Sequence, residues 1–246
     1  PSYTGQILTL TYPLIGNYGV PAKTTEHGLP GSFESDRIHI SALIVSDYST
    51  DYSHWNAEQS LGNWLKSENI PALTGIDTRA LTKRLREKGT MLGKVVINDE
   101  HVELYDPNRE NLITRVSIKE PVVYNEEGGP GIVIIDCGAK SNIIRSLIRR
   151  GCRVLRVPCD FDFSGLDFDG VLISNGPGDP KMCAQTVASV KKCLDQDVPT
   201  FGICLGNQIL ALAAGAEAFL YKPFDDEELL AAIDRGLDQI ANDGAD

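Results

Sequence analysis

Short apolar runs alternate with amphipathic segments in the second half of the chain, and this pattern predicts a parallel α/β sheet. Strands of a parallel sheet are buried on both faces, so they read as uninterrupted apolar runs rather than as alternating ones. Such runs occur at 132–135, 154–157, 170–174, 200–203 and 219–221. Amphipathic helices are predicted between them, beginning near Ser141, Ala184, Gln208 and Asp225 or Asp226. We therefore expect a flavodoxin-like, doubly wound sheet of five parallel strands over residues 131–246.

The first half lacks this alternation and predicts a smaller mixed β/α domain over residues 1–118. Strand-like runs are found at 7–12, 38–45 and 93–97. Apolar residues at helical spacing predict helices over 56–67 and 78–88. Residues 119–130 are rich in proline, glutamate and glycine, which is typical of a linker.

Composition and charge argue against several classes of protein. The net charge of −11 argues against nucleic acid as a partner, because phosphate binding needs a basic surface. No apolar run approaches the ~20 residues of a membrane span, and no signal-peptide pattern opens the chain. The six cysteines lie between 137 and 204 without the C-x-x-C spacing of metal sites, so we expect no metal, no cofactor and a reducing, cytoplasmic environment.

The clearest candidate for chemistry is a cysteine at a predicted strand-to-helix turn. The segment 202–208 reads GICLGNQ and directly follows the apolar run ending at Phe201. Such a turn exposes a nucleophile at the carboxyl edge of a sheet, and the N-terminus of the following helix favours a thiolate. Flanking glycines allow close approach of a substrate. The alternative is a buried structural cysteine at a tight turn.

A second loop, SNGPGDP at 174–180, favours the functional interpretation. Together the two loops resemble the class I glutamine amidotransferases. The order DCGAKSNIIR at 136–145, SNGPGDP and then FGICLGNQ at 201–208 is similar to the small subunit of carbamoyl phosphate synthetase. Motifs of the first half, such as YPLIGNYG at 12–19, SHW at 53–55 and GIDTRALT at 75–82, resemble that family's other domain. The resemblance covers residues 1–216, and its first motif begins at Pro1, so we expect a chain trimmed at its start.

This resemblance implies that glutamine is hydrolysed through a thioester on Cys204 and that ammonia passes to a synthetase (large) subunit, in pyrimidine or arginine biosynthesis. It places the backbone N–H groups of Gly176 and Leu205 at the oxyanion. It also implies that Ser2, Gly178 and Gln208 contact the glutamine. The alternatives are turn geometry alone for the two glycines and a frayed terminus for Ser2.

Residues 217–246 depart from the family. They contain nine acidic and two basic residues and resemble the last strand and helix of a response-regulator receiver domain, including Lys222-Pro223. The family's late His-Pro-Glu segment, which carries its catalytic histidine and glutamate, has no counterpart here. The four histidines stand at 27, 39, 54 and 101. A chimera explains this pattern, and an unusual natural paralogue is the alternative.

Three functional hypotheses follow from the sequence. The first is a glutaminase component of carbamoyl phosphate synthetase. The second, which we favour, is a catalytically dead chimeric scaffold, because a thiol nucleophile needs a base. The third is a phosphorelay receiver, which the pattern disfavours because Ser174 and Asn175 stand where the phosphoacceptor aspartate belongs.

Overall fold

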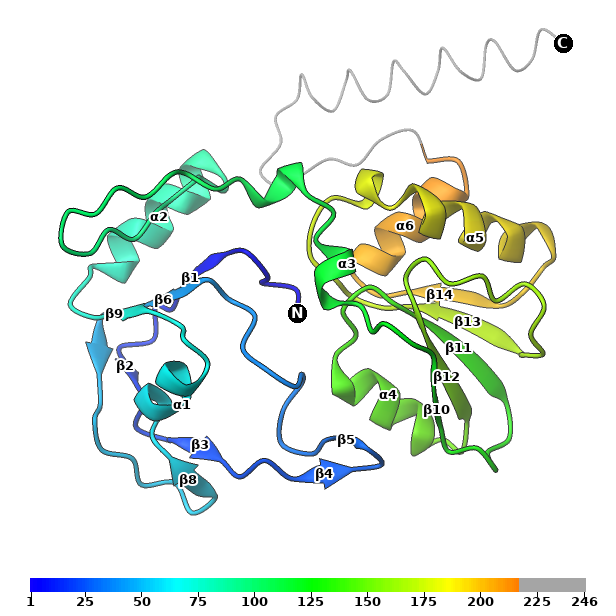
Figure 1. Cartoon of the computed structure of the whole chain (residues 1–246), viewed down its shortest axis with the longest axis horizontal. Coiled ribbons are helices and arrows are strands. Elements are labelled where there is room, and N and C mark those ends of the chain that lie inside the picture. Colours follow the sequence, from blue (N-terminus) through cyan, green and yellow to red (C-terminus); the bar gives the residue numbers. More distant parts are fainter. Residues whose placement is uncertain (217–246) are drawn as a thin grey trace, which may run out of the picture.

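A five-stranded sheet organises the second half of the chain (Figure 1). The computed structural model describes residues 1–216. Four strands are parallel and lie in the order β12-β11-β13-β14, and β10 pairs antiparallel with β12 at one edge. Their bounds are β10 (Val122–Tyr124), β11 (Gly131–Asp136), β12 (Arg153–Pro158), β13 (Gly170–Ile173) and β14 (Thr200–Gly202).

The four parallel strands confirm the strands predicted at 132–135, 154–157, 170–174 and 200–203. The fifth strand of the sheet is a different one from that expected. It is β10, which lies inside the 119–130 segment expected to be a linker. The predicted strand at 219–221 and the helix after it lie outside the described residues, so the flavodoxin-like completion of the sheet stays a prediction.

Helices cover both faces of this sheet. The helix α4 (Ser141–Ile148) packs on one face, and α5 (Ala184–Asp195) and α6 (Leu205–Ala213) pack on the other (Figure 1). The alternation of side chains along β11 divides the core accordingly. Val133 and Ile135 join the α5 and α6 cluster, and Ile134 joins the α4 cluster. Each is at most 1% exposed, and full burial of such a side chain contributes about 1.5–3 kcal/mol.

Residues 1–118, called here the N-terminal region, contain a three-stranded parallel sheet in the order β1-β6-β9 and three small strand pairs. Leu43, Val45 and Leu65 form the centre of its core. The strands are β1 (Ile7–Thr9), β2 (Leu14–Ile15), β3 (Val20–Pro21), β4 (Thr25–Glu26), β5 (Leu29–Pro30), β6 (Ala42–Ile44), β7 (Asp47–Tyr48), β8 (Ala57–Gln59) and β9 (Ala72–Leu73). The helices are α1 (Leu61–Ser67), α2 (Thr78–Lys88) and α3 (Ile113–Val116), with a 3₁₀ turn at Pro107–Arg109. A second 3₁₀ turn, Pro180–Met182, precedes α5.

The helices and strands predicted from the sequence of the N-terminal region agree only partly with those in the structure. The helix predicted over 78–88 is confirmed as α2. The helix predicted over 56–67 begins later, because Ser60 caps α1 by accepting a hydrogen bond from the Asn63 N–H (3.1 Å) and the residues before it form β8. The strand predicted at 93–97 is wrong. Its residues form an irregular segment that does not pair with any strand among the described residues, and Ile97 is 59% exposed.

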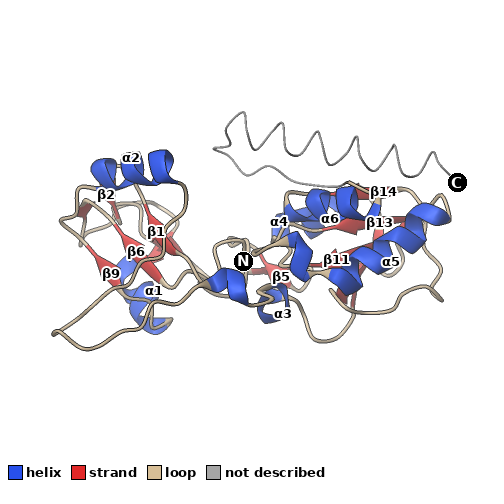
Figure 2. Cartoon of the chain, turned by 90° about the horizontal axis from the view of Figure 1, so that it is seen from above, coloured by secondary structure: helices blue, strands red, loops and turns tan. Residues whose placement is uncertain are grey.

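Within residues 1–216, no helix combines the length and the apolar character that a membrane crossing requires. The N-terminus itself lies between the N-terminal region and the five-stranded sheet, as the two perpendicular views show (Figures 1 and 2).

A charged clasp joins the two halves at α4. The guanidinium of Arg145 is almost fully buried and donates to the backbone oxygens of Pro30 and Phe33 and to the Glu34 carboxylate. In return, Glu34 accepts from the Ser141 N–H through its backbone oxygen (3.0 Å) and from the Asn142 N–H through its carboxylate (3.0 Å). The helix begins at Ser141, as the sequence pattern predicted. Its N-cap residue, Lys140, makes no side-chain cap hydrogen bond, and Glu34 of the N-terminal region takes that place.

Replacing Arg145 with alanine should lower the free energy of unfolding by about 2 kcal/mol, because a buried carbonyl loses its donor and the clasp loses its packing. Urea unfolding followed by circular dichroism measures this. The matched control is Arg149→Ala on the same helix, where an exposed guanidinium lies 3.9 Å from the Glu26 carboxylate and should contribute less than about 0.5 kcal/mol. Equal midpoints for the two variants would contradict the clasp.

Candidate active site

The carboxyl ends of three parallel strands bring the candidate residues together. Loops leave β11, β13 and β14 at the same edge of the sheet. The chain passes from β11 to β12 on one side of it and then to β13 on the other, so the direction in which strands are added reverses beside β11. In open α/β sheets, ligands bind at such a switch point, outside the carboxyl ends of the strands. The loop 174–180 follows β13, and Cys204 follows β14.

Cys204 occupies a strained corner between β14 and α6. Its backbone has φ of 54° and ψ of −112°, a conformation that non-glycine residues rarely adopt. The corner is packed so tightly that a Cβ on Gly202 would lie 2.6 Å from the Asn207 Cα. A Cβ on Gly206 would collide with the backbone oxygen of Ile173 and lie 2.8 Å from that of Ser174. Cys204 itself is exposed, so it is not the buried structural cysteine of the alternative interpretation.

The helix after the corner presents an unpaired backbone donor. The Cys204 oxygen accepts from the Asn207 N–H (3.0 Å) and the Gln208 N–H (3.2 Å), which starts α6. The Leu205 N–H forms no hydrogen bond within residues 1–216. Leu205 is its helix's first residue, where the N–H groups point out of the helix and carry its positive dipole end. A developing negative charge beside Cys204 would find this donor in place.

Gly176 lies against the same corner from the β13 side. A Cβ there would collide with the Cys137 oxygen and lie 2.8 Å from the Leu205 side chain. Only glycine fits this contact, and the Gly176 N–H also has no acceptor among the described residues. The structure thus brings together Cys204, Leu205 and Gly176, the three residues assigned from the sequence to attack and to oxyanion binding.

The other residues predicted from the sequence differ in burial and in the groups that they contact. Gln208 is half-buried in the first turn of α6. Gly178 is exposed and has φ of 86°. A Cβ built on it would lie 3.5 Å from the Leu112 side chain. Ser2 is held rather than frayed, since its Oγ accepts a hydrogen bond from the Asn175 Nδ2 (3.0 Å).

Sequence reasoning missed the polar residues that hold these loops. Asp136, at the end of β11, is fully buried and accepts from the backbone N–H groups of Ile118, Gly138 and Ala139 (2.7–2.9 Å). The Arg156 guanidinium pairs with the same carboxylate at 2.8 Å. The motif at 136–139 was visible in the sequence, but only the structure shows that it is a hydrogen-bonding centre.

The histidines lie in the N-terminal region. His54 lies beside the rings of Tyr18 and Trp55, with centroids 5.7 and 5.3 Å away, and all three residues are exposed. His39 lies beside Thr4 near the N-terminus. Burial lowers the pKa of His39 to about 4, with further lowering by the terminal ammonium and Arg37, so this ring is a weak base at neutral pH.

The remaining cysteines contrast with Cys204. Burial raises the pKa of the Cys137, Cys159 and Cys193 thiols, and it raises that of Cys183 to about 12. Such thiols stay protonated and unreactive. In the part of the chain that the structure describes, no cluster of three or more His, Cys, Asp or Glu side chains has the arrangement of a metal site.

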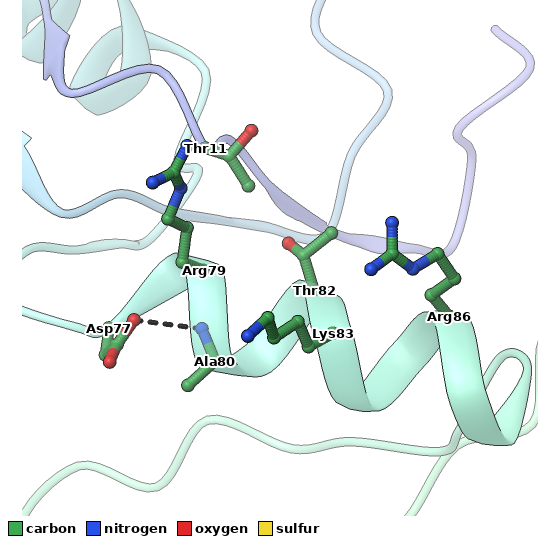
Figure 3. A pocket seen from close by; sticks show the side chains of 7 residues that line it. All are labelled: Thr11, Asp77, Arg79, Ala80, Thr82, Lys83 and Arg86. Carbon is green, nitrogen blue, oxygen red and sulfur yellow. Dashed lines mark hydrogen bonds between the residues drawn. The ribbon is translucent and has the colours of Figure 1, made fainter.

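A separate cavity of about 520 Å³ lies along α2 in the N-terminal region (Figure 3). Its charged lining is mainly basic, and its one carboxylate, Asp77, caps α2 by accepting from the Ala80 N–H (2.9 Å). Its lining contains no cysteine, serine or histidine. The cavity is lined by Thr11, Asp77, Arg79, Ala80, Thr82, Lys83 and Arg86.

Comparison with known families agrees with this geometry. Residues 1–95 match the carbamoyl-phosphate synthase small chain, CPSase domain, and residues 133–237 match the class-I glutamine amidotransferases. The first stretch is thus similar to a carbamoyl-phosphate synthase small chain domain, and the second is similar to class I glutamine amidotransferases. The second match includes the loops of the candidate site and continues past residue 216, into the acidic segment 217–246.

Individual relatives show the same similarity. The chain is 46% identical over 244 residues to the carbamoyl phosphate synthase arginine-specific small chain of Neurospora crassa, covering 95% of this chain and 54% of that protein. It is 54% identical over 228 residues to multifunctional protein CAD of Squalus acanthias, covering 90% of this chain and 10% of that protein. It is 48% identical over 223 residues to the mitochondrial carbamoyl-phosphate synthase [ammonia] of Homo sapiens, covering 89% and 15%. The chain therefore spans about half, or much less, of the relatives it matches.

Replacing Gly206 with alanine should destabilise the fold by about 2–3 kcal/mol, because the new methyl group meets backbone atoms that cannot rotate away. Chemical denaturation measures the change. Gly165→Ala is the matched control, since its Cβ would enter open space in an exposed turn and should change stability by less than about 0.5 kcal/mol. A Gly206→Ala protein as stable as the control would show that the corner is loose.

Proposed function

We propose that this chain is the glutamine-hydrolysing component of a carbamoyl-phosphate synthase, with Cys204 as its nucleophile. The observation that carries the proposal is an exposed thiol at a strained corner, flanked by two backbone N–H groups that have no acceptor in residues 1–216. Similarity to small chains and class I amidotransferases supports it.

In the proposed reaction, the Cys204 sulfur attacks the side-chain amide carbon of glutamine. The carbonyl oxygen becomes an oxyanion that accepts hydrogen bonds from Gly176 and Leu205, and each such donor lowers the barrier by roughly 3–4 kcal/mol. The carbon–nitrogen bond then breaks, the amide nitrogen takes up the proton that the thiol has lost and leaves as ammonia, and a thioester forms on Cys204. Water hydrolyses the thioester to glutamate and restores the thiol.

Recognition of the substrate is assigned to the residues around this corner. Ser2, Gly178 and Gln208 contact glutamine in the proposed complex, and the ammonia passes to a synthetase subunit or domain. The printed names of the relatives, which include multifunctional proteins and an arginine-specific small chain, support such a partner. A cytoplasmic location belongs to the same proposal.

We further propose that, in the polypeptide of residues 1–246, the Cys204 thiol reacts with electrophiles but does not sustain turnover of glutamine. Its four histidines stand at 101 or earlier, and His39 has a pKa too low for an efficient base. An origin as a chimera with a receiver-like segment after residue 216 is the second part of this hypothesis. It rests on the acidic composition of that segment and on the Lys222-Pro223 motif, which lie outside the described residues.

A chloromethyl ketone analogue of glutamine should alkylate Cys204 faster than every other cysteine of the chain. The buried thiols have raised pKa values and no access to solvent, and half-buried Cys152 lies outside the site. Peptide mass spectrometry after short exposure measures the order of labelling. Cys204→Ser should abolish the fast phase, whereas Cys152→Ser should leave it unchanged. Fast labelling at any other cysteine would refute the assignment of the nucleophile.

Steady release of glutamate from glutamine should stay at the level of the Cys204→Ser variant, because protonation of the leaving nitrogen lacks a suitable acid. A coupled glutamate dehydrogenase assay measures the release. Turnover that continues over many cycles and is lost in Cys204→Ser would contradict the proposed inactivity while supporting the nucleophile.

A further inference from the structure

Asn175 holds three chain segments at the candidate site. It follows β13, is 4% exposed, and uses both atoms of its amide group. Its Oδ1 accepts from the Lys140 N–H (3.1 Å), and its Nδ2 donates to the Gly138 oxygen (2.8 Å) and to the Ser2 Oγ (3.0 Å). The first two partners belong to the loop after β11, and the third belongs to the N-terminus.

The backbone partners fix the orientation of the amide. An N–H can only donate and a carbonyl oxygen can only accept, so Lys140 requires the oxygen of Asn175 and Gly138 requires its nitrogen. The second hydrogen of that nitrogen therefore points to Ser2. The Ser2 oxygen is consequently an acceptor toward Asn175, and its own proton is left to donate elsewhere.

Asn175 also adjoins the proposed oxyanion donor. The next residue is Gly176, which packs against the Cys137 oxygen and the Leu205 side chain. The loop 137–140 that Asn175 binds on one side is thus the same loop on which Gly176 rests. A single buried amide fixes the position of the Ser2 hydroxyl relative to Gly176 and, through Leu205, to Cys204.

We propose that Asn175 is a positioning residue that presents the Ser2 hydroxyl as a hydrogen-bond donor to an oxygen of glutamine. This inference rests on the proposed function, since it specifies how that site recognises its substrate. Asn175 acts through Ser2, so its effect is on substrate binding rather than on the reactivity of the thiol.

The test compares two electrophiles on purified protein of residues 1–246. The chloromethyl ketone analogue of glutamine carries the amino and carboxylate groups of the substrate, and iodoacetamide carries neither. With the analogue, Asn175→Ala and Ser2→Ala should each raise the half-saturating concentration for Cys204 labelling about tenfold, the effect of one lost hydrogen bond. The limiting rate, and the rate with iodoacetamide, should stay within about twofold of the unmodified protein.

A double-mutant cycle separates positioning from a general structural role. The Asn175→Ala, Ser2→Ala double variant should bind the analogue no more weakly than either single variant, because both changes remove the same contact. Ser2→Thr keeps the hydroxyl and should retain most of the binding. Effects that multiply in the double variant, or an Asn175→Ala protein that saturates like the unmodified one, would overturn the inference.

Two further results keep the test decisive. Should Asn175→Ala fail to fold, Asn175→Asp provides the second variant. Its carboxylate still accepts from the Lys140 N–H but has no proton to donate to the Gly138 oxygen or to the Ser2 Oγ, so binding of the analogue should weaken at least as much. If the unmodified protein shows no saturable labelling of Cys204 by the analogue while iodoacetamide labels it, the proposed function itself fails. Saturable labelling that Asn175 variants do not alter refutes the positioning role alone.

Discussion

The buried carboxylate of Asp136 is the interaction on which the candidate site depends. A carboxylate without solvent is stable only when its oxygens are fully paired, and here three backbone N–H groups and one guanidinium supply the pairing. Two of these donors, Gly138 and Ala139, fold the loop after β11 back onto the strand. The third, Ile118, fastens the chain that enters the sheet. Because Gly176 and Asn175 both rest on that loop, the position of the oxyanion donor follows from the satisfaction of one buried charge.

The corner at Cys204, in contrast, is a strained backbone conformation that costs free energy. A positive φ at a non-glycine residue costs of order 1–3 kcal/mol, and here it is maintained by close packing of glycines on both sides. Without strain, the chain would carry the thiol along the strand, into the sheet or its covering helices. The strained turn instead leaves Cys204 exposed, next to the Leu205 N–H at the start of α6, which has no acceptor among the described residues. The fold tolerates this local strain because residues of β13 and α6 next to the corner are buried.

Periodicity in the sequence predicted the parts whose causes are local. Continuous apolar runs such as 132–135 identify buried strands, and helical spacing identified α2 with its observed bounds. The misses have long-range causes. The strand β10 is three residues between prolines and glycines, and only its pairing with β12 makes it a strand. The cap of α4 comes from Glu34, more than a hundred positions earlier in the chain. The Asn175–Ser2 hydrogen bond joins residues 173 positions apart, which no local pattern can indicate. Motif resemblance pointed to Cys204, Gly176 and Leu205 because all three stand in a short loop or directly after one.

In the proposed function, two parts of the chain share the recognition of glutamine, so the clasp at Arg145 would affect substrate binding as well as stability. Ser2 belongs to the N-terminal region, whereas Asn175 and Cys204 follow strands of the five-stranded sheet. Arg145 and Glu34 fix the same two parts against each other at α4, the helix that follows the loop bound by Asp136 and Asn175. Loosening the clasp would therefore change the place of Ser2 while leaving the strained corner and its N–H donors intact, since these arise within the sheet alone. Thiol reactivity and substrate fit are, on this structure, separable properties: the first depends on the backbone around Cys204, and the second depends on how the N-terminal region is held.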